Sequence, residues 1–204
     1  MRLSPVARFF WTVVFLLPFT FAAWYFMGIL LTTPVAALVE WVMSGLFPQA
    51  LSGIEQHGFL LDVLTRFSPP GIPQGELTFR VNPMIYGYSM PLYTAILLAT
   101  PGREGEKWRH WLIGILILYL VQVFGVCLDI LKTLTFEMGG QVTAQMHLTA
   151  QWQLDAVALG YQFGYLILPA VSPIAIWIAF HRPFIATLAP DLAARMTPPS
   201  DESH

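Results

Sequence analysis

Three side chains of this sequence could carry thiol chemistry, namely Cys127, His147 and Arg80. A cysteine attacks as its thiolate, which a neighbouring base or positive charge stabilises. Cys127 precedes Lys132 by little more than one helical turn, and His147 could fold over it. Nothing local in the sequence supports this pairing, and a single cysteine on an apolar helix usually packs as a small hydrophobic side chain. The three residues are therefore candidates for catalysis without a supporting motif.

Four ionisable residues are expected near the edge of a membrane: Arg80, Asp129, Lys132 and Asp155. Asp129 and Lys132 are three residues apart, so they can pair on one face of a helix. Ionisable groups at this depth often have a function. Ordinary ion pairing and snorkelling explain them equally simply. We interpret them as a structural polar cluster at the membrane edge.

A second polar set lies inside the apolar segments and carries no charge. Amide and hydroxyl groups in lipid find partners across helices, so we interpret this set as helix packing, with a lined cavity or a subunit contact as the alternative. Its members are Asn82, Tyr86, Tyr88, Gln122, Tyr161, Gln162 and Tyr165.

The histidines are isolated in the sequence. None has the spacing to a second histidine or cysteine that places metal ligands together. We therefore expect no metal and no cofactor. A single cysteine also excludes an intramolecular disulfide.

Four stretches without a charged residue must position these side chains. They cover residues 9–39, 81–102, 111–128 and 156–181. Crossing a hydrocarbon layer of ~30 Å takes roughly 20 helical residues, and in lipid the backbone must satisfy its own hydrogen bonds. The sequence therefore predicts a mainly α, polytopic membrane protein with one membrane domain. Its four transmembrane helices are expected at residues 9–31, 83–100, 111–131 and 156–180.

Composition agrees with this class. Hydrophobic residues make up 56% of the chain and charged residues 11%, against about 25% charged in an ordinary soluble domain. The net charge of −2 leaves no basic surface for nucleic acid. The first apolar run is longer than the ~7–15 residues of a signal-peptide core, so we expect it to be retained.

The basic residues predict the orientation. Seven of the ten lie on one side if four helices alternate, and lysine and arginine mark the cytoplasmic side. Residues 1–8, 101–110 and 181–204 are then cytoplasmic, with both termini, and residues 34–82 and 132–155 face outward. In a bacterium this corresponds to the inner membrane and the periplasm.

The first outward segment changes its periodicity. Residues 34–51 have helical spacing and are expected to lie in the interface, with a continuation of the first helix as the alternative. Residues 59–67 and 76–81 alternate with period two around a proline- and glycine-rich link. They predict a small periplasmic β-hairpin, which needs another surface to rest on.

Three stretches carry a resemblance to a known family. They are VNPMIYGYSMPL at residues 81–92, QVFGVCLDILK at 122–132 and YQFGYLILP at 161–169. The chain resembles the small membrane proteins associated with exosortase H. The resemblance implies an accessory role near an envelope protein sorting system. Exosortases use a cysteine, an arginine and a histidine, but the motifs around Cys127, Arg80 and His147 do not match, so no catalytic role is transferred.

Three functions follow from these observations. The leading hypothesis is a non-enzymatic accessory subunit that contacts the lipid bilayer and binds a membrane protein partner through its periplasmic face. The second is a membrane-embedded thiol peptidase or transpeptidase that uses Cys127. The third is a supernumerary subunit of a respiratory or photosynthetic membrane complex.

Overall fold

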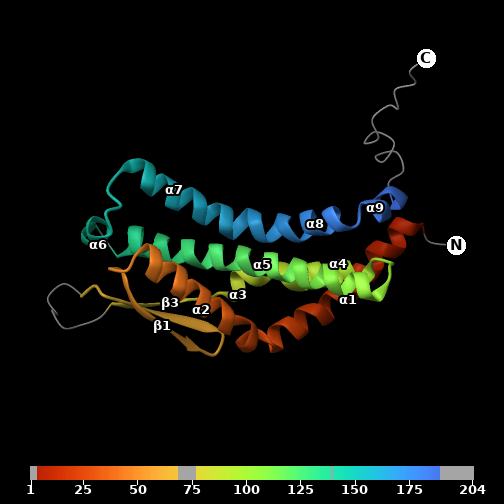
Figure 1. The fold of residues 1–204 in the computed structure, drawn as a ribbon, viewed down its shortest axis with the longest axis horizontal. Helices are drawn as coiled ribbons and strands as arrows, with labels where there is room; N and C mark the ends of the chain where they lie inside the picture. Colours follow the sequence, from red (N-terminus) through yellow and green to blue (C-terminus); the bar gives the residue numbers. More distant parts are fainter. Residues whose placement is uncertain (1–3, 69–76, 139, 189–204) are drawn as a thin grey trace, which may run out of the picture.

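A computed structural model describes residues 4–68, 77–138 and 140–188 (Figure 1). By length and composition, four of its helical segments could cross a membrane: Pro5–Phe26, Gly28–Leu46, Glu104–Glu137 and Gln151–Phe180. A small antiparallel sheet accompanies them. The predicted class, a mainly α polytopic membrane protein, is confirmed.

Helix α1 (Pro5–Phe26) and helix α2 (Gly28–Leu46) meet at Met27, where the chain bends. Ser4 caps α1 by accepting a hydrogen bond from the backbone of Ala7. The bend allows Gly28 to pack against Met84, where a side chain on residue 28 would meet the methionine sulfur and methyl group. The first helix therefore ends earlier than predicted.

Helix α2 differs from the predicted interfacial helix at both ends. It begins at Gly28 and ends at Leu46, with Pro34 inside it. One stripe of the helix, which includes Val35, Val39 and Met43, is fully buried. α2 therefore packs along α5 and the sheet.

The sheet contains β1 (Leu51–His57), β2 (Leu60–Thr65) and β3 (Thr78–Val81) in that order. The predicted antiparallel pairing is present between β2 and β3. The strand β1 was not predicted, because a register shift between Leu51 and Gly53 interrupts its alternation. Gly58, with a φ of 67°, makes the tight turn between β1 and β2.

The remaining helices form an antiparallel set (Figure 1). Helices α3 (Met84–Gly87) and α4 (Ser89–Ala99) together occupy the second predicted span. Helix α5 (Glu104–Lys132) continues as the π-helix η1 (Thr133–Glu137). After α6 (Gly140–Gln145) the chain returns through α7 (Gln151–Gln162), the π-helix η2 (Phe163–Ile167) and α8 (Leu168–Phe180), and then forms α9 (Arg182–Leu188).

Helix α5 with η1 is longer than one membrane crossing needs. Its 34 residues extend about 51 Å, against a hydrocarbon layer of ~30 Å. One half of it packs in a bundle with α1, α4 and α8, and the other half packs with α2 and the sheet. The molecule therefore has two cores that share one helix.

We call these the bundle core and the sheet core. The bundle core includes Tyr93, Leu97 and Leu118, all at most 2% exposed. The sheet core includes Leu61 and Ile130, both fully buried. Helix α3 lies where the two cores meet (Figure 1).

Candidate functional site

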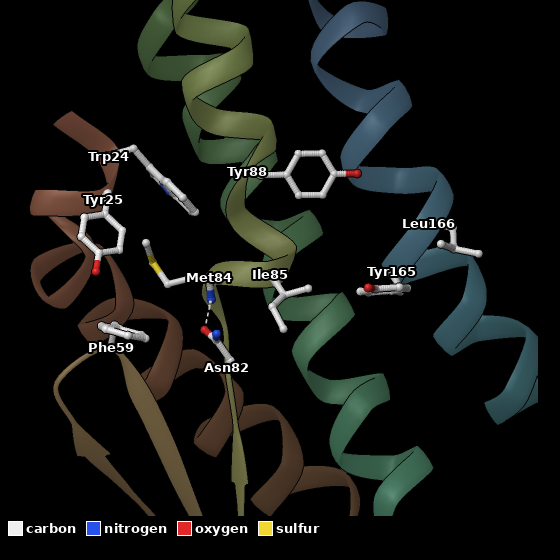
Figure 2. A pocket seen from close by; sticks show the side chains of 9 residues that line it. All are labelled: Trp24, Tyr25, Phe59, Asn82, Met84, Ile85, Tyr88, Tyr165 and Leu166. Atoms are coloured by element: carbon white, nitrogen blue, oxygen red, sulfur yellow. Dashed lines mark hydrogen bonds between the residues drawn. The ribbon is translucent and has the colours of Figure 1, made fainter. Parts of the chain in front are cut away.

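A cavity of about 650 Å³ opens at the junction of the two cores. Figure 2 shows Trp24 and Tyr25 of α1 on one side, and Tyr88 and Tyr165 on the other. Met84 lies between them. None of the nine lining residues that Figure 2 labels is an aspartate, glutamate, lysine, arginine or histidine. The cavity is therefore lined by apolar and uncharged polar side chains.

Tyrosines from three segments meet beside this cavity. Tyr86 of α3 is 2% exposed, and its hydroxyl hydrogen-bonds to the Asp129 carboxylate of α5. The ring centroids of Tyr86 and Tyr165 are 6.0 Å apart, and Tyr161 stacks on Tyr165 at 5.8 Å. The structure thus brings together Tyr86, Tyr161 and Tyr165 of the predicted packing set, with Tyr88 on the same cavity.

Glycines allow the three segments to approach closely. A side chain at Gly125 would overlap the ring of Tyr86, and one at Gly164 would lie 3.2 Å from the Cα of Gly125. Small residues are the usual device for close helix contact in membranes. Tyr86 can therefore lie directly between α5 and η2.

The asparagine and glutamine side chains of the predicted packing set lie at different positions in the structure. Gln122, 2% exposed, donates from Nε2 to the carbonyl of Pro83 at 2.9 Å, which joins α5 to the start of α3. Asn82 accepts from the backbone amide of Met84 at 3.1 Å. Gln162 is exposed and takes no part in this packing.

The predicted polar cluster at the membrane edge is divided among different partners. Arg80 pairs with Asp62, and Asp155 accepts a hydrogen bond from Gln151 at 2.9 Å. Lys132 pairs with Glu137 and lies 5.4 Å above the ring of Tyr161. The carboxylate of Asp129 hydrogen-bonds to the hydroxyl of Tyr86. Only Asp129 and Lys132 remain neighbours, because the sheet directs Arg80 to its outer face.

A charged network lies on that outer face of the sheet. Arg80 of β3 is opposite Asp62 of β2 and donates to both carboxylate oxygens, from Nε at 2.6 Å and from Nη2 at 2.9 Å. Nδ1 of His57 lies 3.0 Å from the same carboxylate. The Arg80 guanidinium lowers the pKa of Asp62, and the carboxylate in turn raises the pKa of Arg80.

Asp62 and His57 were not among the site residues predicted from the sequence. The predicted strands contained enough information to place Asp62 beside Arg80, since both lie on the polar side of an alternating pattern. His57 had no such signal, because its strand was not predicted. The network is thus a property of three paired strands.

Acid should weaken this network. Because the pKa of Asp62 is lowered by folding, its pairing stabilises the protein above the unfolded pKa of about 4. That contribution is lost as the pH falls through the lower folded value. We expect wild type to unfold at a higher temperature than Asp62→Asn at neutral pH, and the gap to close in acid. The thermal unfolding midpoints of the two proteins, measured from neutral to acid pH, test this prediction.

Glu55→Gln is the matched control for this prediction. Glu55 lies opposite Asp62 on β1 and forms no ion pair with another residue of the described chain. Its substitution should leave no pH-dependent gap. A gap between wild type and Asp62→Asn that is the same at acid and neutral pH would contradict the assigned pairing.

The three candidates for thiol chemistry are placed in different environments. Cys127 is 8% exposed and packs in the sheet core. His147 follows α6, is exposed and has a φ of 56°. The guanidinium of Arg80 is occupied by Asp62. Within residues 4–68, 77–138 and 140–188, no hydrogen bond or ion pair joins Cys127, His147 and Arg80.

No group of three or more metal-binding side chains is found in the part of the chain that the structure describes.

Comparison with known families decides the identity of the chain. Residues 3–184 match the family model described as exosortase H-associated membrane protein. The chain belongs to this family. Neither a curated protein nor a solved structure matches it.

The stretches that resemble the exosortase H-associated proteins meet in space. Tyr86 lies in the first, Gly125 in the second and Gly164 in the third, and these residues are in contact. Gln122 of the second stretch also bonds to Pro83 of the first. The resemblance therefore coincides with the packing of α3, α5 and η2 at the junction of the two cores.

Proposed function

We propose that this exosortase H-associated protein is a non-enzymatic accessory subunit of an exosortase-type envelope sorting system in the bacterial inner membrane. In this proposal its partner is the exosortase itself. The membership of the chain in the family supports an association with this system over the respiratory or photosynthetic alternative. The buried position of Cys127 supports a subunit without thiol catalysis, since a reactive thiol needs access and an activating charge.

The observation that carries the proposal is an exposed apolar face on the half of the molecule that contains the sheet. Trp41 of α2 is 75% exposed and Leu46 is 66% exposed, although the opposite stripe of the same helix is fully buried. Exposed apolar patches mark contact with a partner or a membrane. A helix with one buried and one exposed apolar face is suited to lie between this protein and another membrane protein.

The distribution of charge supports an outward-facing sheet. The first turns of α1, α5 and α9 lie at the end of the molecule opposite the sheet (Figure 1), and they carry Arg8, Lys107 and Arg182. Lysine and arginine favour the cytoplasmic side. We therefore propose that both termini are cytoplasmic and that the sheet and the exposed face of α2 are periplasmic.

Crosslinking in native membranes tests the proposed contact. A photoreactive amino acid at position 41 or 46 should crosslink to a co-expressed exosortase, because both side chains are exposed on the proposed face. The matched control is position 116 on the bundle half of α5, where Leu116 is 64% exposed. A photoreactive amino acid at position 116 should crosslink to lipid and give little crosslinked exosortase.

Two results would contradict the proposal. One is the absence of exosortase product from both positions 41 and 46 when the exosortase is present in the same membrane. The other is equal product from position 116, which would mean that the contact reflects crowding in the membrane and not a specific face.

A further inference from the structure

A lateral groove runs along the bundle half of the protein. Its floor is α4, and α1 and α5 form its walls. The groove consists of two cavities that share Leu98: an apolar cavity of about 360 Å³ and a second one of about 480 Å³ at the basic end of the bundle. Leu98 is 54% exposed, so the groove is open to the surroundings of the helices.

Helical spacing shows that one face of α1 lines both cavities. The second cavity takes Arg8 and Thr12 from this helix, and the apolar cavity takes Leu16, Thr20 and Ala23. Residues three or four apart lie on one face of a helix. A single face of α1 therefore carries a charge at one end and apolar side chains further along.

The opposite wall repeats this arrangement. Lys107 lines the cavity at the basic end, and Trp111 and Ile115 line the apolar one, each four residues further along α5. Two polar side chains that line the apolar cavity, Thr94 and Trp111, form hydrogen bonds within the protein. Trp111 Nε1 donates to the Thr94 hydroxyl at 3.0 Å, and that hydroxyl donates to the carbonyl of Met90 at 2.8 Å. The inner part of the groove thus presents an apolar surface.

The two cations at the basic end of the groove differ in their pairing. The side chain of Lys107 is only 17% exposed, and its ammonium lies 3.4 Å from the carboxylate of Glu104, which is 79% exposed. Arg8 forms no ion pair with any residue that the structure describes. Two cations thus line the cavity, and the carboxylate that pairs with Lys107 belongs to an exposed side chain. An anion between Arg8 and Lys107 would complete this site.

We propose that the groove binds one anionic glycerophospholipid. Its phosphodiester lies between Arg8 and Lys107, and one acyl chain passes over Leu98 into the apolar cavity. The dimensions fit: Arg8 and Ala23 are about 22 Å apart along α1 at ~1.5 Å per residue. Half of a bilayer with its headgroups is about 20 Å thick. One lipid therefore reaches from the basic end to Ala23.

Lipid titration of the purified full-length protein, followed by native mass spectrometry, tests the proposal. Wild type should retain one phosphatidylglycerol and bind phosphatidylcholine more weakly. Arg8→Gln and Lys107→Gln should each weaken phosphatidylglycerol binding about five-fold, as expected for one basic residue near an anionic lipid. Arg109→Gln is the matched control, because Arg109 is an exposed residue of the same helix end outside the groove.

A second pair of variants tests the acyl-chain part of the groove. Ala23→Trp should fill the apolar cavity and abolish retention of the lipid. Ala22→Trp should not, because Ala22 is exposed at the same depth and does not line the cavity. Equal binding of both lipids to wild type would overturn the proposal, as would equal retention by the two tryptophan variants.

Discussion

Gly114→Ala should lower the stability of the helix bundle by roughly 1–3 kcal/mol, the usual effect of overpacking a filled core. A methyl group on Gly114 would overlap the ring of Tyr93. This ring cannot move aside easily, because Tyr93 is fully buried and its hydroxyl donates to the carbonyl of His110 at 2.7 Å. The thermal unfolding midpoint in detergent should therefore fall.

Gly105→Ala is the control on the same helix. Nothing lies within 4 Å of the added carbon at Gly105, and alanine is favoured over glycine in a helix by up to ~1 kcal/mol. This variant should be as stable as wild type or slightly more stable. If both substitutions stabilise the protein, the close packing of α4 on α5 is wrong.

Leu61→Ala should destabilise the sheet core by about 2–5 kcal/mol, as large-to-small substitutions of fully buried residues do. Leu61 is fully buried, and in the sheet it pairs with Gln56 on one side and Val81 on the other. Its removal leaves a cavity between the sheet and the helices. Hydrogen exchange of the strand amides should show the loss of protection, because it reports opening of this part of the protein separately from the bundle.

Leu60→Ala is the matched control for this variant. Leu60 is the preceding residue of β2 and points to the outer face, where it is only partly buried. Leu60→Ala should destabilise the sheet core much less than Leu61→Ala. Equal loss of protection in the two variants would contradict the assignment of inner and outer faces. If the sheet half also binds the exosortase, Leu61→Ala should reduce crosslinking from position 41 and Leu60→Ala should not.

The elements that were predicted correctly are those whose sequence pattern depends only on residue type and local spacing. The alternation in β2 identified both its inner residues, such as Leu61 and Val63, and its outer ones. The boundary between α1 and α2 was misplaced, because Pro34 is a strong local signal and the contact of Gly28 with Met84 is not local. β1 was missed for a related reason, since its irregular register has meaning only against β2.

The sequence predicted which polar residues belong to the candidate site, but it did not predict which of them contact each other. The set of polar residues in the membrane segments contained Tyr86, Tyr161 and Tyr165, which do meet at the junction of the cores. The choice of partner for each charge could not be read from the sequence. Arg80 was grouped with Asp129 by its expected depth, but the sheet places it beside Asp62.

By itself, the sequence determined that this is a mainly helical membrane protein, that one end is basic and which family it belongs to. Whether a segment enters the lipid and whether a loop is basic both depend on residue type. Spacing and composition are therefore enough to predict them. Only the tertiary structure decided that α5 joins two cores and that Cys127 is buried in one of them. These features depend on contacts between residues that are far apart in the sequence, such as those of α3 with α5 and η2.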